Sequence, residues 1–259
     1  MKRRGPSYRR PFSPRGRWSQ VDPRATQAAL RKAFRRWGRP ERLRVDNGAP
    51  WGSRGDLPTD LVCWLAGLGV AVTDNPPRRP QANGVVERFQ GVGKMWAEPG
   101  QCRTSRELQG RLDELDRWQR ELYPVVDVRG RLEAYPGLRH SGRASDSAWE
   151  AAHWDLQRVW DLMARYLVPR RVDSQGKVSV YNRPHSVGPI WSGRTIWVGF
   201  DPVQGSWVFQ DEQGHEIRRQ AATELDAASI RALRVTNRRQ GVHAAKPTVG
   251  TNAAKPTVR

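Results

Sequence analysis

Apolar residues recur at helical spacing in the first half of the chain. Residues 23–37 carry an apolar stripe with a period near 3.6, and Asp22 and Pro23 suit the cap and the first position of a helix. A short apolar run at 43–45 predicts a strand that ends at Asp46. A second stripe at 56–69 predicts another helix, and residues 70–72 predict another short buried strand. This helix–strand order is typical of an α/β sheet.

A loop and a third helix follow. Residues 75–83 hold three prolines and two arginines, which predicts a loop. The pattern at 83–95 predicts a helix with Glu87 in its first turn. Its apolar residues, among them Phe89, can face a core, whereas Glu87 and Lys94 share the opposite face. Taken by itself, that face fits an ordinary solvated helix surface equally well.

The middle of the chain predicts two more helices with a loop between them. Thr104 and Glu107 have the spacing of a capping box, and the leucine stripe that follows, as far as Leu122, is expected to face a core. Scattered proline and glycine at 123–143 predict a loop. A second capping box at 147–150 predicts the start of another long helix, which we expect to connect two parts of the protein.

The period changes to two after about residue 168. Short alternating segments end in turns that contain glycine, a pattern that predicts a small antiparallel barrel. The expected strands are 177–181, 195–200, 206–210 and 216–219.

The charge balance points to a polyanionic partner. Lys and Arg total 45 against 26 Asp and Glu, which gives a formal net charge of +19. Each cation that neutralises a DNA phosphate releases condensed counterions, so such a chain is expected to bind nucleic acid. Residues 1–18 carry seven of these cations and no acid. That leader favours a disordered segment somewhat over an arm that touches DNA.

Several other chemistries are disfavoured. Cys63 and Cys102 have neither zinc-site spacing nor enough partners for a disulfide framework, so we expect reduced thiols in a cytoplasmic protein. The run 91–94 lacks the remaining residues of a phosphate-binding P-loop. No run of about 18 or more apolar residues occurs, so no membrane span is expected. The predicted location is the cytoplasm, in association with the nucleoid.

Two short motifs carry a resemblance to a known family. The segments LRVDNG at 43–48 and NGVVERF at 83–89 are joined by the loop PRRPQANG. In this order and spacing they resemble the catalytic core of DDE-type insertion-sequence transposases and retroviral-type integrases of the rve family, which share an RNase H-like fold. The resemblance extends from about residue 21 to about residue 239. Asp46 and Glu87 match the family's second and third catalytic acids.

The resemblance implies metal-dependent DNA cleavage and strand transfer. Asp46 and Glu87 would be catalytic ligands of Mg²⁺ or Mn²⁺, hard cations that prefer oxygen donors. A C-terminal SH3-like barrel would bind DNA, and the protein would act as a homo-oligomer on DNA. The residues expected to contact DNA are Arg78, Arg79, Arg88, Lys94, Arg170, Arg171 and Lys177.

One element of the family pattern has no counterpart in the sequence. The first catalytic Asp normally precedes the second by about fifty residues or more, on the central strand, but Asp22 is the only acid before Glu41 and sits at a helix cap. We therefore expect an N-terminally truncated, partial RNase H-like α/β core that lacks its first strands and, by itself, binds metal weakly and joins no strands. The alternative is a non-catalytic basic DNA-binding fragment. The expected divisions are 1–20 (leader), 21–125 (partial core), 126–167 (linker with helix), 168–236 (barrel) and 237–259 (tail).

Overall fold

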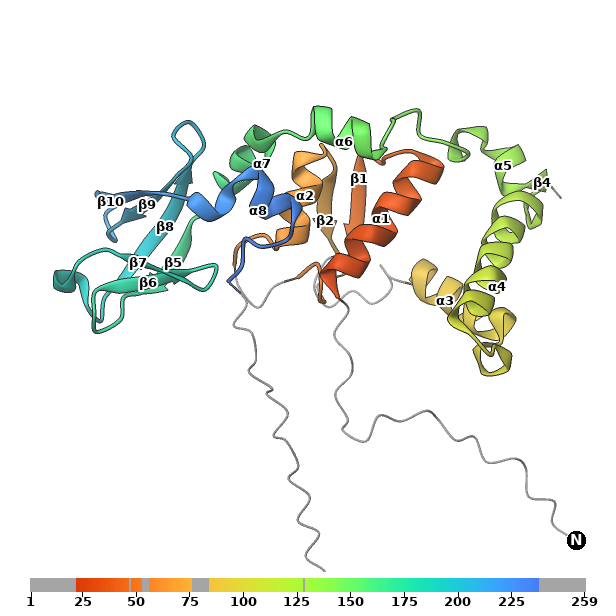
Figure 1. Cartoon of the computed structure of the whole chain (residues 1–259), viewed down its shortest axis with the longest axis horizontal. Helices are drawn as coiled ribbons and strands as arrows, with labels where there is room; N and C mark the ends of the chain where they lie inside the picture. The colour runs from red at the N-terminus through yellow and green to blue at the C-terminus, as the bar shows by residue number, and fades with distance from the viewer. Residues whose placement is uncertain (1–21, 47, 53–55, 76–83, 128, 238–259) are drawn as a thin grey trace, which may run out of the picture.

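Two short parallel strands are the centre of the first half of the protein. The structure is a computed structural model that describes residues 22–46, 48–52, 56–75, 84–127 and 129–237 (Figure 1). Strand β1 (Arg42–Val45) pairs in parallel with β2 (Ala71–Asp74), in a register that places Val45 opposite Asp74. Helices α1 (Pro23–Trp37) and α2 (Asp60–Gly67) lie beside them. The predicted helix–strand order of this region is confirmed.

Local capping fixes the ends of these helices. The Asp22 carboxylate accepts a hydrogen bond from the Arg24 amide at 3.0 Å, as its place before Pro23 predicts. Helix α2 begins at Asp60 and not at residue 56, because the Thr59 hydroxyl caps it by accepting from the Val62 amide.

Helices α3 (Gly84–Ala97) and α4 (Ser105–Arg117) pack on each other, at the right of Figure 1. Thr104 caps α4 as predicted, accepting from the Glu107 amide at 3.1 Å. The expectation of a core-facing leucine stripe is wrong at Leu122, which is 60% exposed, and the expected core residue Phe89 is 43% exposed. Leu115 on α4 is buried, as the stripe predicts, whereas Leu122 lies beyond α4, in the turn that follows it.

The stretch predicted as a loop at 123–143 contains short regular elements. A π-helical turn (Trp118–Leu122) leads into β3 (Pro124–Val126), which pairs with β4 (Arg129–Gly130), and α5 (Arg131–Ala134) follows. Such short elements lack the apolar periodicity on which the sequence prediction depended.

Two helices stand where one was predicted in the connecting segment. Helix α6 (Ser147–His153) is capped by Asp146, whose carboxylate accepts from the Trp149 amide at 2.7 Å. Helix α7 (Leu156–Met163) is capped in the same way by Asp155. The predicted Ser147 capping box is therefore wrong, because the aspartate one position earlier supplies the cap.

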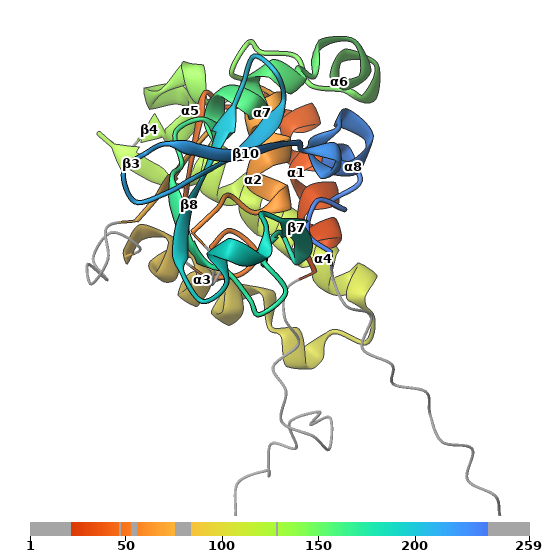
Figure 2. The ribbon, with the colours of Figure 1, turned by 90° about the vertical axis from the view of Figure 1, so that its left-hand side faces the viewer.

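The second half of the protein is built from antiparallel strands (Figure 2). A four-stranded sheet has the order β10-β9-β8-β5, and β6 pairs with β7 as a separate hairpin. The four predicted strands are confirmed, and two more flank them. Closure into an SH3-like barrel, like the RNase H-like fold of the first half, stays a prediction. The bounds are β5 (Val168–Arg171), β6 (Lys177–Val180), β7 (Arg183–Ser186), β8 (Thr195–Asp201), β9 (Ser206–Gln210), β10 (Glu216–Ala221) and α8 (Ala227–Arg231).

One continuous apolar core joins the two halves. It runs from Phe34 on α1 through Trp64 on α2 and Met163 on α7 to Ile196 and Trp207 in the β-sheet. Helix α7 is thus part of the core and not only a connector. The expected domain boundaries themselves stay predictions.

A partly buried ion pair ties α6 to α1 and α2. The Glu150 carboxylate accepts from Arg31 Nη2 at 2.7 Å and Nε at 2.9 Å, across 119 residues of sequence, and from Trp64 Nε1 at 3.0 Å. Burial opposes ionisation of Glu150, but the hydrogen bonds from Arg31 and Trp64 and the nearby charges outweigh it and lower its pKa.

The C-terminal segment returns to the same helices. Thr236 donates from its amide and its hydroxyl to Asp60 Oδ1, at 3.2 and 2.6 Å, and Gln27 Nε2 donates to the Arg231 carbonyl at 3.1 Å. The end of the described chain is thereby held against α1 and α2. Every helix of the described segments is too short or too polar to cross a lipid bilayer.

Candidate functional site

Asp46 lies directly after β1, at the carboxyl edge of the parallel pair. Its side chain is exposed and folds back over the following turn, since a Cβ added to Gly48 would lie 3.4 Å from Asp46 Oδ2. The Gly48 carbonyl accepts from the amides of Trp51 and Gly52, at 3.0 and 2.9 Å. A small residue at position 48 therefore lets the carboxylate lie against a tight backbone turn.

Glu87 lies in the first turn of α3, as predicted. Glu87, Arg88, Gly91 and Lys94 are all exposed, and a Cβ added to Gly91 would meet no described atom within 4 Å. Carboxylates are favoured in the first turn because they complement the positive end of the helix dipole.

The two acids belong to separately packed elements. Asp46 follows β1, which pairs with β2, whereas Glu87 is on α3, which packs on α4. The described residues contain no group of three or more His, Cys, Asp or Glu side chains arranged to hold a metal ion. The expectation that Asp46 and Glu87 meet around one cation therefore stays a prediction. Arg78 and Arg79, predicted to contact DNA, lie outside the described residues.

The predicted DNA-contacting residues of the β region differ in whether their side chains already have hydrogen-bond or ion-pair partners. Arg170 forms an ion pair with Asp56 at 3.1 Å and also donates to the Pro169 carbonyl. Arg171 is exposed, and Lys177 Nζ donates to Gln175 Oε1 at 3.1 Å. Arg171 is thus the best placed of the three to reach a phosphate.

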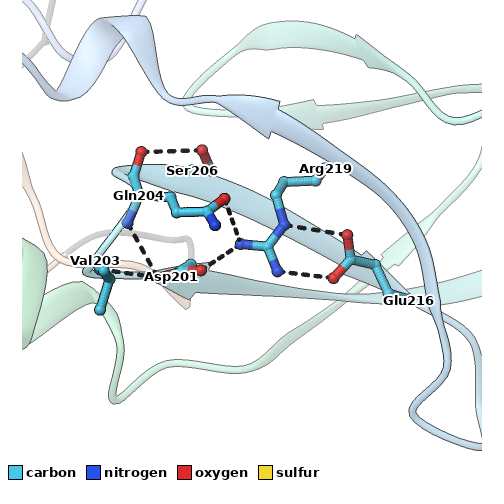
Figure 3. A network of polar contacts seen from close by, with 6 residues as sticks. All are labelled: Asp201, Val203, Gln204, Ser206, Glu216 and Arg219. Carbon is cyan, nitrogen blue, oxygen red and sulfur yellow. Dashed lines mark hydrogen bonds and ion pairs between the residues drawn. The ribbon is translucent and has the colours of Figure 1, made fainter.

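Arg219 shows that not every cation of this region is available to a ligand. Its guanidinium donates to both oxygens of Glu216, at 3.1 and 2.8 Å, and also to Asp201 and Gln204 (Figure 3). Hydrogen bonds from Arg219 come first among the causes that lower the pKa values of both carboxyl groups. This network closes the turn between β8 and β9 and neutralises the arginine.

A cavity of about 500 Å³ lies beside β2 and α7, and neither Asp46 nor Glu87 lines it. Its polar lining includes Asp74 and Tyr166. Burial, followed by the negative charge of Asp74, raises the pKa of Tyr166. The sequence held no signal for this cavity, because its lining combines residues between 41 and 74 with residues between 158 and 166.

Comparison with known proteins adds little. No protein-family model matches the chain. Among solved structures, the chain is similar to one in the cryo-EM structure of the simian T-cell lymphotropic virus intasome in complex with PP2A regulatory subunit B56 gamma. The two chains are 20% identical, the match covers 49% of this chain and 43% of that one, and the TM-score is 0.37. A likeness at this TM-score supports no conclusion on fold or function.

Proposed function

We propose that this protein binds DNA and is a partial metal-dependent polynucleotidyl transferase of the DDE transposase and integrase kind, with Asp46 and Glu87 as two of its metal-binding carboxylates. The observation that carries the proposal is that both acids are exposed at the ends of the elements that the motifs predict. Asp46 follows a parallel strand, and the crevice outside the carboxyl ends of parallel strands is where open α/β sheets bind ligands.

The chemistry of these two side chains fits a hard divalent cation. Mg²⁺ is usually held by one or two carboxylates, with water and substrate phosphate oxygens completing its coordination. Asp46 and Glu87 could supply the protein oxygens, and a bound Mg²⁺ or Mn²⁺ would stabilise the charge that develops on phosphate oxygens. Arg88 and Lys94, exposed on the helix of Glu87, would hold the DNA backbone.

Charge supports DNA as the substrate. A formal net charge of +19 favours binding to any polyanion, and phosphate contacts make that binding fall steeply with salt. Arg171, exposed on β5, would add a contact from the β region, and a second copy of the chain on the same DNA would complete the assembly.

The test is whether divalent metal changes DNA binding through these two acids. We expect Mg²⁺ or Mn²⁺ to strengthen the binding of a labelled duplex, and Asp46→Asn or Glu87→Gln to abolish that gain without changing the affinity measured in EDTA. Asp74→Asn is the matched control, because Asp74 is exposed at the same end of the parallel sheet. Nicking or joining of DNA strands, where detected, should vanish in both variants. Metal stimulation that survives in both would refute the carboxylate assignment.

A second candidate function is a non-catalytic DNA-binding module that competes with a complete transposase for the ends of its element. The observation that favours it is the position of Asp22, which caps α1 and is therefore not a metal ligand on a strand. This function predicts salt-sensitive DNA binding that is the same with and without divalent metal in the wild type. DNA binding that is weak and insensitive to salt would contradict both functions.

A further inference from the structure

Three arginine side chains from separate segments converge on the carboxyl end of α2. Arg39 precedes β1, Arg143 precedes α6, and Arg158 is on α7. Each donates to a backbone carbonyl at this helix end: Arg39 to Leu68, Arg143 to Gly69 at 3.0 Å, and Arg158 to Gly67 at 3.3 Å. The three guanidinium groups are therefore held close together by fixed main-chain acceptors.

The cluster has more positive charge than its surroundings neutralise. Arg158 pairs with Asp155 at 3.4 Å, but within the described chain Arg39 and Arg143 form no ion pair. Glu41, an acid that lines the neighbouring cavity with Arg158, also forms no ion pair with any of the three. Burial, together with the charges of Arg143 and Arg158, lowers the pKa of Arg39 to about 10.

Two donors of the cluster have no acceptor in the described part of the protein. Arg39 is only 7% exposed and stacks on the Trp149 ring at 3.8 Å, yet its Nε atom makes no hydrogen bond. Arg143 Nη1 is likewise buried and without an acceptor. Buried donors are nearly always satisfied, so two in one cluster of cations call for oxygen atoms from elsewhere.

Capping of α2 explains only part of this arrangement. Cations are favoured at a helix carboxyl end, where they complement its dipole and satisfy its last carbonyl groups. That role uses one donor from each arginine. It leaves Arg39 Nε and Arg143 Nη1 unexplained, and roughly half a negative charge from the dipole cannot balance the two guanidinium groups of Arg39 and Arg143.

We propose that Arg39, Arg143 and Arg158 form a binding site for a single phosphate group. Guanidinium groups match the geometry of phosphate oxygens, and Arg158, with a side chain 46% exposed, provides access from solvent while Arg39 forms the floor. Gly69 keeps the site open, since it has a positive φ and a Cβ there would lie 3.1 Å from Arg158 Nη1.

The site is separate from the two candidate acids. Gly69 precedes β2, at the amino edge of the parallel pair, whereas Asp46 follows β1 at the carboxyl edge. Four residues of strand put these edges about 13 Å apart. The phosphate can come from the DNA backbone or from free inorganic phosphate, and neither source requires the proposed carboxylate chemistry.

The experiment has two arms, each using the full chain. In the first, sodium phosphate is titrated calorimetrically at constant ionic strength. Saturable binding should weaken about tenfold or more in Arg143→Gln and in Arg158→Gln, because each loses charge-assisted hydrogen bonds. Arg24→Gln, which alters an exposed arginine of α1, is the matched control and should bind as the wild type does. Circular dichroism confirms that each variant is folded.

The second arm separates the two sources of phosphate. If the ligand is a DNA phosphate, the slope of log affinity against log salt should fall by about 0.9 in Arg143→Gln relative to Arg24→Gln. If it is free phosphate, only the calorimetric binding is lost and the DNA slope is unchanged. No saturable phosphate binding by the wild type together with an unchanged DNA slope would overturn the proposal. So would equal losses in Arg24→Gln and Arg143→Gln.

Discussion

Replacing Glu150 by glutamine should weaken the joint between α6 and the first two helices. The Glu150 side chain is 7% exposed and receives two hydrogen bonds from Arg31 and one from Trp64. Glutamine keeps the shape and one acceptor but removes the charge that Arg31 faces. Breaking a fully buried ion pair costs roughly 3–5 kcal/mol, but Arg31 is 38% exposed and can regain water, so we expect a loss of about 2 kcal/mol.

The assay is unfolding in urea at pH 7, followed by tryptophan fluorescence, with a thermal melt as a second measurement. A loss of about 2 kcal/mol corresponds to a fall in Tm of about 4–8 °C for a protein of this size. Glu98→Gln is the matched control, because Glu98 forms an ion pair with Arg111 at 3.2 Å while its side chain is 50% exposed. That substitution should change stability by less than about 1 kcal/mol.

The effect should depend on pH in a defined direction. The pKa of Glu150 is lowered in the folded state, so its contribution to stability is complete above the unfolded pKa of about 4.3 and is lost as the pH falls through the folded pKa. The difference between wild type and Glu150→Gln should therefore be largest at neutral pH and shrink in acid. Equal stability at pH 7, or a difference that persists unchanged at acid pH, would refute this reasoning.

Two further predictions follow from packing and burial. Gly67→Ala should lower the free energy of unfolding, measured in urea, by about 1–3 kcal/mol, because the added methyl group would overlap the Trp154 indole. The control Gly110→Ala, which has open space around it on α4, should raise it slightly, and equal effects of the two substitutions would contradict the described contact. Burial and the charge of Asp60 raise the pKa of Cys63 to about 12. Maleimide at pH 8 should therefore label the half-buried Cys102 and not Cys63, as measured by mass spectrometry, and labelling of both at the same rate would contradict the burial of Cys63.

The sequence predicted those elements whose signals are local. The start of α1 followed from Asp22 and Pro23, and the start of α4 from Thr104, because a cap acts within four residues of itself. The strands near residues 195–210 followed from alternation within a few positions. In each case the residues that decide the structure are neighbours in the chain.

The features that the sequence did not predict depend on contacts between residues far apart in the chain. The pairing of Arg31 with Glu150 spans 119 residues, and no local pattern predicts that the two side chains meet. The same holds for the convergence of Arg39, Arg143 and Arg158 on α2. The exposure of Phe89 was predicted wrongly because helical periodicity identifies an apolar face but not what covers it. Of the candidate site, the sequence predicted the two acids and the elements that carry them. That both acids bind one cation stays a prediction.

Whether Asp46 and Glu87 bind one cation is tested most directly by a Mn²⁺ titration followed by electron paramagnetic resonance, with the DNA duplex present. If Asp46 and Glu87 bind the same cation, Asp46→Asn and Glu87→Gln should each remove the same bound Mn²⁺, and the double variant should lose no more than either single one. Asp74→Asn should keep it. Losses that add in the double variant, or Mn²⁺ binding that is unchanged in both single variants, would contradict the central claim.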